Sequence, residues 1–226
     1  IDWLYDYEKP ASTECISNST INNPDPFDDD SGIALYKLDG NANDTTGDHD
    51  GVVTGTPAYI SGEFGKCIDY NSAYVSLPMA SLHTGFTLSV HFTTVLNDSI
   101  LISRFYHLYA GEEIYIDGSG FARAGYGSGS GWSKTYNILG STDLRDGLWH
   151  HAVHTYDGSI AKLYVDNVLI GTSAAATAPA ATSGTLRMNG DIQTGSTNQT
   201  SESDQLRIFN RALTADEVTI LYNERK

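Results

Sequence analysis

The sequence has few cysteines, few basic side chains and no long apolar segment, and each shortage excludes a class of protein. Two cysteines among 226 residues cannot form the framework of a disulfide-rich domain. No apolar run approaches the roughly 20 residues that span a bilayer, so we expect no membrane insertion. Thirteen Lys and Arg against 28 Asp and Glu give a formal charge of -15. Such a surface repels phosphate backbones and anionic lipids, so we expect no nucleic-acid partner.

Length and composition favour one large all-β domain. The chain is 40% hydrophobic and 11% aromatic and contains 22 glycines, which allows a sizeable core joined by many turns. The acidic charge is compatible with divalent cations, although solubility alone also explains it. The chain begins with Ile and carries no signal-peptide pattern, so we interpret it as a processed product or a fragment.

Residues 146–172 are predicted to form three short antiparallel strands. Side chains alternate with a period of two in 149–156 and again in 162–166, which is the pattern of half-buried strands. Asp157-Gly158 and Asp166-Asn167 separate these segments and supply the residues that hairpin turns require.

Three ordered motifs carry a family resemblance. They are Trp-His-His at 149–151 with Leu-Tyr-Val-Asp-Asn at 163–167, the stretch 34–44 with Gly-Glu-Phe-Gly-Lys at 62–66, and the segment 204–217. Together they resemble the laminin-G-like members of the concanavalin A-like lectin/glucanase superfamily. The resemblance implies a jelly-roll sandwich of two antiparallel sheets over residues 33–226, preceded by an arm and tether at 1–32. A capping box formed by Thr214 and Glu217 predicts one short C-terminal helix. The Gly-rich tract at 118–131 is expected to interrupt the strand pattern, and residues 205–209 are expected to form the last strand. The resembled family commonly has Trp at or near position 91, where this chain has His.

The arm and tether leave two questions open. Ile1, Trp3, Tyr5 and Tyr7 share one face of a strand pattern. This strand would pack on its own domain or dock into a neighbouring subunit. A bridge between Cys15 and Cys67 would attach the tether to the jelly roll, but two free thiols are the alternative.

The loop that begins at Asp39 is a candidate calcium site. Asp39, Asn41, Asn43 and Asp44 place oxygen donors close together, and Ca²⁺ prefers oxygen ligands in irregular geometry. The resemblance implies a structural Ca²⁺ held by Asp39, Asn41, Asp44 and Asp204. The alternative is an Asx-rich turn whose side chains bind their own backbone.

Enzymatic activity is not expected. Glu202 and Asp204 have the spacing of a glucanase carboxylate pair, but Leu206 stands where a third carboxylate is needed, and the calcium set also includes Asp204. His150 and His154 would lie on one face of a strand and His151 on the other. We therefore interpret these histidines as structural rather than as zinc ligands.

Sugar recognition is the function that the resemblance implies. Rings for stacking and polar groups for hydroxyls come together in one stretch of sequence: Tyr126, Trp132, Tyr136, Arg123, Asn137 and Asp117. The alternative is that these aromatic residues belong to the core. We predict a non-catalytic module that binds carbohydrate or a surface ligand outside the cell. The competing hypothesis is a structural or adhesive subunit of a virion, filament or surface layer.

Overall fold

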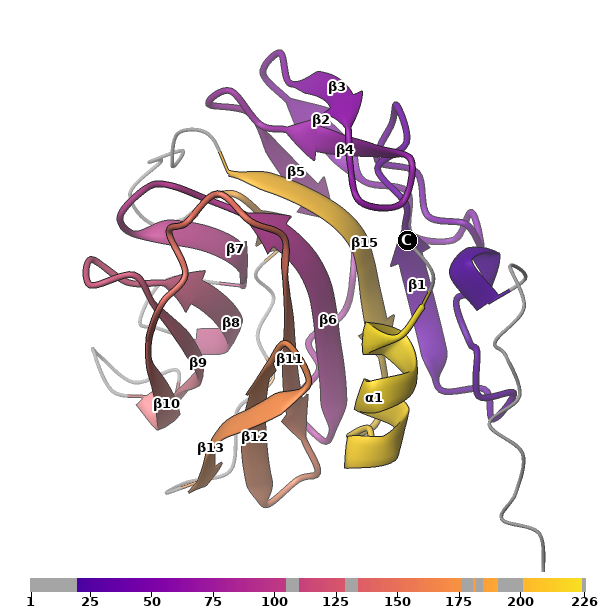
Figure 1. The fold of residues 1–226 in the computed structure, drawn as a ribbon. Coiled ribbons are helices and arrows are strands. Elements are labelled where there is room, and N and C mark those ends of the chain that lie inside the picture. The colour runs from indigo at the N-terminus through magenta and orange to yellow at the C-terminus, as the bar shows by residue number, and fades with distance from the viewer. Residues whose placement is uncertain are drawn as a thin grey trace, which may run out of the picture.

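The computed structural model describes residues 20–104, 110–128, 134–175, 181, 185–190 and 201–224. In this part of the chain two antiparallel sheets pack face to face (Figure 1), which confirms the predicted jelly-roll sandwich. Sheet A comprises β1 (Gly32–Tyr36), β3 (Ala58–Ser61), β4 (Lys66–Asp69), β6 (Phe86–Thr93), β11 (His150–Tyr156), β12 (Ile160–Val165), β13 (Val168–Ala174) and β15 (Glu202–Phe209). Sheet B comprises β2 (Val52–Thr54), β5 (Tyr74–Leu77), β7 (Ser99–Ser103), β8 (Ala110–Ile116), β9 (Phe121–Ser128), β10 (Lys134–Asp143) and β14 (Leu186–Met188).

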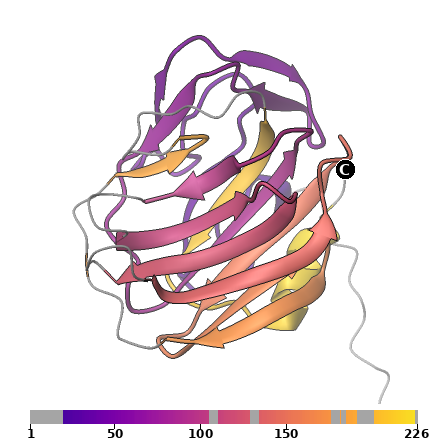
Figure 2. The ribbon, with the colours of Figure 1, turned by 90° about the vertical axis from the view of Figure 1, so that its left-hand side faces the viewer.

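Two edge strands, β10 of sheet B and β13 of sheet A, lie side by side. Sheet A runs β13-β12-β11-β6-β15-β4-β3, with β1 also paired to β15, and sheet B runs β10-β9-β8-β7-β14-β5-β2. Figure 2 shows the outer face of sheet B, where β7 to β10 form a broad surface. The predicted meander is confirmed as β11, β12 and β13, whose neighbours pair in antiparallel register.

Side-chain alternation fills the space between the sheets. Phe86, Leu88, Val90 and Phe92 of β6 point into the main core. The intervening residues of β6 are also buried, because other elements cover part of the outer face of sheet A. Helix α1 (Ala215–Tyr222) provides much of this cover through a second apolar cluster. A 3-10 turn, η1 (Thr20–Asn22), begins the described chain.

The predicted helix and its capping box are confirmed. Glu217 N–H donates to Thr214 Oγ1 at 3.3 Å, and Thr214 N–H donates to Glu217 Oε2 at 2.7 Å. Leu213 and Val218 are both buried beside the first turn, which is the arrangement of a hydrophobic staple. At the other end of the helix, the buried side chain of Glu224 pairs with Arg207 of β15. These contacts fix the position of Tyr222 in the last turn.

Two features differ from the sequence interpretation. The Gly-rich tract at 118–131 was expected to interrupt the strand pattern, but residues 121–128 form β9. A Cβ at Gly125 would lie 3.0 Å from Glu113 Oε1 and 3.1 Å from the Tyr136 carbonyl oxygen, so neighbouring strands occupy the space of a side chain here. Strand β15 also begins at Glu202, before the expected Gln205, and the register shifts between Asp204 and Arg207.

The described part of the predicted tether lies against the sandwich. The rings of Phe27 and Phe209 are 5.7 Å apart, and Asp29 accepts from Arg211 Nε at 2.7 Å. Ile1, Tyr7 and Cys15 lie outside the described residues, so arm docking and the Cys15–Cys67 bridge stay predictions. Cys67 itself is buried on β4, and burial raises the pKa of its thiol to about 12. No helix in the described ranges is long and apolar enough to cross a membrane.

Candidate functional site

The first candidate site is the turn between β3 and β4, which ties together two residues of the predicted calcium set. The backbone N–H groups of Glu63 and Phe64 donate to Asp204 Oδ2 at 3.0 and 2.9 Å. Lys66 N–H donates to Asp39 Oδ1 at 2.8 Å. A Cβ at Gly62 would lie 2.7 Å from Asp204 Oδ2, so the turn can approach this carboxylate only because glycine stands there.

The Asp204 carboxylate is buried beneath this turn. Its Oδ1 atom is fully buried and has no hydrogen-bond partner among the described residues. Burial, with a further contribution from the charge of Asp39, raises the pKa of Asp204 to about 7. A positive partner beside this carboxylate would favour its ionised form.

The other two members of the predicted set bind backbone N–H groups of the loop and of β1. Asp44 Oδ1 accepts from Leu35 N–H at 2.9 Å, and Asn41 Oδ1 accepts from Asn43 N–H at 2.9 Å. Within the described ranges no three His, Cys, Asp or Glu side chains form a cluster suited to a metal. The geometry therefore brings Asp39 and Asp204 together through one turn, and calcium binding stays a prediction.

The residues predicted to bind sugar separate into three groups. Tyr126 and Tyr136 are only 0% and 4% exposed and pack within the core, which favours the core interpretation of these two rings. Arg123 and Asn137 lie at the outer surface of sheet B, where Arg123 pairs with Asp117 at 2.6 Å. Trp132 lies outside the described residues.

A second candidate site lies beside the C-terminal end of α1, on the outer side of sheet A. We call it the histidine pocket. Its volume is about 220 Å³, and it is lined by Glu63, His91, Leu148, Trp149, His150, His151, Asp166 and Tyr222. These residues come from the β3–β4 turn, β6, the loop before β11, β11 itself, the β12–β13 turn and α1. The sheet therefore assembles the pocket from segments that are distant in sequence.

Strand register places the two central imidazoles against each other. His91 of β6 pairs with His151 of β11, and their rings stack with centroids 4.2 Å apart and an interplanar angle of 14°. His91 Nδ1 lies 2.7 Å from Glu63 Oε2, and His151 Nε2 lies 2.7 Å from Ser89 Oγ. The ring of Tyr222 is also stacked with His151, with centroids 6.1 Å apart. These contacts hold the inner wall of the pocket in one arrangement.

The rim of the pocket combines charge with aromatic surface. His150 Nδ1 lies 2.7 Å from Asp166 Oδ2, and this contact raises the pKa of His150. Trp149 and Tyr222 are half-buried, so part of each ring remains accessible. Carboxylates accept hydrogen bonds and imidazoles donate or accept them, while aromatic rings offer apolar faces. The pocket therefore offers hydrogen-bonding groups and apolar ring faces side by side.

Sequence reasoning did not identify this pocket, although it used two of its parts. Trp149, His150 and His151 were interpreted as a fold signature, and His91 stands where the resembled family commonly has Trp. Glu63 belongs to the Gly-Glu-Phe-Gly-Lys motif but was given no role in binding, and Tyr222 lies outside the motifs. The partners became visible only through the register of β6 with β11 and the position of α1.

The predicted carboxylate pair does not form an open catalytic cleft. Asp204 is buried beneath the β3–β4 turn, and Glu202 Oε2 lies 3.9 Å from Cys67 Sγ. Leu206 is part of the core, so no third carboxylate stands on the same strand at that position.

Comparison with known proteins agrees with this architecture. Residues 69–219 match the sequence model of the concanavalin A-like lectin/glucanases superfamily. This match covers more than half of the chain, and the chain belongs to that superfamily. No curated protein shows a significant sequence match.

Several solved structures share the fold at low sequence identity. The binding domain of Paraclostridial Mosquitocidal Protein 1 has a TM-score of 0.71 at 18% identity, over 84% of this chain and 51% of that chain. The botulinum neurotoxin serotype C1 binding domain gives 0.68 at 18%, over 90% and 52%. Domain 4 of AbnA, an extracellular GH43 arabinanase from Geobacillus stearothermophilus solved with arabinotriose, gives 0.66 at 20%, over 84% and 97%. The chain spans about half the length of the two toxin domains.

Proposed function

We propose that this chain is a non-catalytic module that binds carbohydrate outside the cell, through the histidine pocket. The observation that carries the proposal is the composition of this pocket. Two half-buried aromatic rings, Trp149 and Tyr222, lie beside two carboxylate–imidazole pairs, Glu63–His91 and Asp166–His150. Sugars present apolar ring faces and hydroxyl groups at the same time, so they match this combination.

The related structures support the same class of ligand. The arabinanase domain was solved with arabinotriose, and cell entry of botulinum neurotoxin type C depends on interaction with two ganglioside molecules. Both ligands are glycans or carry glycans. The fold alone does not establish function, so the argument depends on the pocket of this chain.

The proposal includes a structural calcium ion at the β3–β4 turn. Asp39 and Asp204 would hold it, and Asp204 Oδ1 is a buried acceptor with no described partner. The ion would neutralise the two carboxylates and stiffen the turn. It would not take part in any reaction.

A glycan array, probed with the purified protein in calcium and again in chelator, tests the proposal. We expect binding to one class of sugar. A blank array with a well-folded protein would overturn carbohydrate recognition.

Matched variants then locate the site. Tyr222→Ala removes one aromatic wall and Glu63→Gln removes one carboxylate, and each should weaken binding by about tenfold, since a hot-spot contact contributes on the order of 1.4 kcal/mol. Asn137→Ala, at the outer surface of sheet B, is the control and should leave affinity unchanged. The reverse result would move the site to sheet B.

A further inference from the structure

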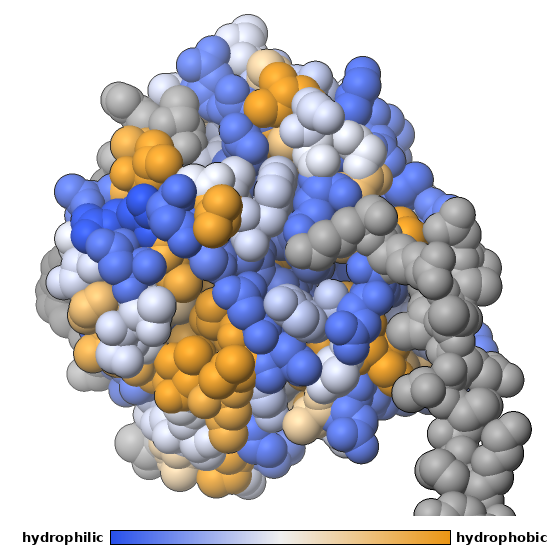
Figure 3. All heavy atoms as spheres, viewed as in Figure 1, coloured by the Kyte–Doolittle hydropathy of each residue, from blue (hydrophilic) through white to orange (hydrophobic). Residues whose placement is uncertain are grey.

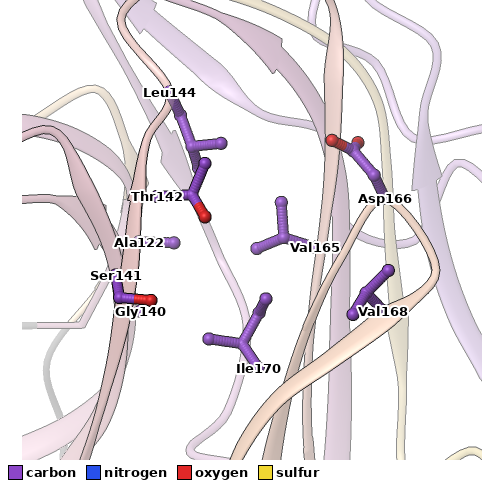
Figure 4. A pocket seen from close by; sticks show the side chains of 9 residues that line it. All are labelled: Ala122, Gly140, Ser141, Thr142, Leu144, Val165, Asp166, Val168 and Ile170. Carbon is purple, nitrogen blue, oxygen red and sulfur yellow. The ribbon is translucent and has the colours of Figure 1, made fainter.

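A groove lined mainly by apolar side chains lies between the edge strands of the two sheets (Figure 4). It has a volume of about 210 Å³. Leu144 and Ala122 line it on the β9–β10 side, and Val165, Val168 and Ile170 line it on the β12–β13 side. We call it the apolar groove. Strands β10 and β13 end their sheets, so neither has a further strand to cover this region.

The groove exists because the two edge strands touch only along part of their length. A Cβ at Gly171 would lie 2.7 Å from Ile138 Cγ2, and one at Gly140 would lie 3.4 Å from Ile170 Cγ2. The groove is bounded by residues 140–144 and 165–170, beyond the closest contact at Gly171. Val168 and Leu169 of β13 are 61% and 49% exposed, and Figure 3 shows an apolar patch over β12 and β13.

The apolar groove lies next to the histidine pocket, because the two cavities share one lining residue. Asp166 lines both, and in Figure 4 its carboxylate stands at one end of the groove. The loop before β11 also connects them, because Leu144 lines the groove and Leu148 lines the pocket. Asp166 is held in place by His150 Nδ1 at 2.7 Å and by His151 N–H at 2.9 Å. A polar cavity and an apolar one therefore share a single fixed carboxylate.

The geometry points to a ligand that is amphipathic in the same way, namely a hexose with an alkyl or acyl aglycone, as in a glycolipid. The sugar would occupy the histidine pocket, and the hydrocarbon would pass Asp166 into the apolar groove. This inference rests on the proposed function and narrows its ligand class. The shared Asp166 places the groove beside the sugar pocket, which favours a hydrocarbon that is attached to the sugar over an unrelated peptide or a second copy of the chain.

Chain length gives the inference a measurable consequence. Each methylene removed from water strengthens binding by about fourfold, until the groove is full. The dissociation constants of methyl, butyl and octyl β-D-glucosides, β-D-galactosides and β-D-mannosides, measured by calorimetry below their micellar concentrations, should therefore fall with alkyl length and then level off.

Three variants test the location. Ser141→Trp fills the groove and should abolish the advantage of octyl over methyl, while the affinity for the methyl glycoside stays unchanged. Val168→Ser should reduce that advantage severalfold. Val95→Ser is the matched control, because Val95 is 64% exposed and lines neither cavity; it should change nothing.

The outcomes separate this inference from the proposed function. Equal affinity for methyl and octyl glycosides, or a positive glycan array with no hexoside binding, overturns the aglycone site and leaves carbohydrate recognition standing. A blank array with no glycoside binding overturns both. Octanol binding as tightly as the octyl glycosides, or self-association that Ser141→Trp abolishes without any alkyl effect, assigns the groove to another occupant and also overturns the inference.

Discussion

Acidification should destabilise the domain through His154, a residue inside the sandwich. His154 is 0% exposed, its Nε2 lies 3.1 Å from Tyr136 Oη, and its ring meets Phe86 edge-on at 4.9 Å. Burial lowers the pKa of His154 from 6.5 to about 3. Between pH 6.5 and pH 3 the unfolded chain binds a proton at His154 that the folded chain excludes. The folded state therefore keeps its full stability from this residue above pH 6.5 and loses that stability as the pH falls toward 3.

The size of the effect follows from the two pKa values. One pH unit corresponds to about 1.4 kcal/mol, so the loss attributable to His154 between pH 7.5 and pH 4 is about 3 kcal/mol. Other groups titrate in the same range, including Asp204, whose pKa is raised to about 7. Subtracting the unfolding free energy of a His154→Gln variant from that of the wild type cancels the contributions of these other groups, because both proteins contain them. Glutamine is chosen because it keeps a polar group near Tyr136 and does not titrate.

Urea unfolding followed by tryptophan fluorescence at pH 7.5, 6, 5 and 4 measures this difference. The stability advantage of the wild type over His154→Gln should shrink steadily below pH 6.5. Parallel pH profiles for the two proteins would refute the reasoning, as would a His154 pKa near 6.5 measured by NMR in the folded protein.

Three further predictions concern single positions. Glu224→Gln removes the carboxylate that pairs with the buried Arg207 and should lower the unfolding free energy by about 3–5 kcal/mol; unchanged urea stability would contradict this. Calcium at about 100 times its Kd should raise the Tm of the wild type by roughly 5–10 °C over chelator, whereas Asp204→Asn should lose this rise; identical wild-type melting curves would exclude the ion. Gly125→Val should destabilise by about 1–3 kcal/mol, because its side chain meets the Tyr136 carbonyl oxygen; a neutral effect in urea unfolding would contradict the packing.

The fold was largely predictable because its strongest signals are local. The two turns of the 146–172 meander and the Thr214–Glu217 capping box each lie within a few residues. Their conformations can therefore be predicted without knowing which distant residues pack against them. Strand β9 was missed because glycine carries no side-chain pattern. The reason for Gly125 is the presence of Glu113 and Tyr136 on neighbouring strands, which a local pattern does not reveal.

The candidate site was less predictable because it depends on the pairing register of the strands and on which face of each sheet meets the other sheet. Alternation could place Tyr126 and Tyr136 on one face of a strand, but it could not say whether that face meets the other sheet or solvent. The core interpretation, which the sequence left open, fits their burial. The histidine pocket depends on the pairing of His91 with His151 and on a helix that begins more than sixty residues later. No local motif contains that information.

The β3–β4 turn connects the two candidate sites through one residue. Glu63 donates its backbone N–H to Asp204 at 3.0 Å, while its carboxylate lies 2.7 Å from His91 in the histidine pocket. A cation held by Asp39 and Asp204 would restrict the turn from one side, and a ligand in the pocket would meet the Glu63 side chain on the other. Calcium and ligand would then each strengthen the binding of the other, because binding free energies are reciprocal between coupled sites. Any calcium dependence of glycan binding should therefore diminish in Glu63→Gln, even though that substitution leaves both carboxylates of the cation site in place.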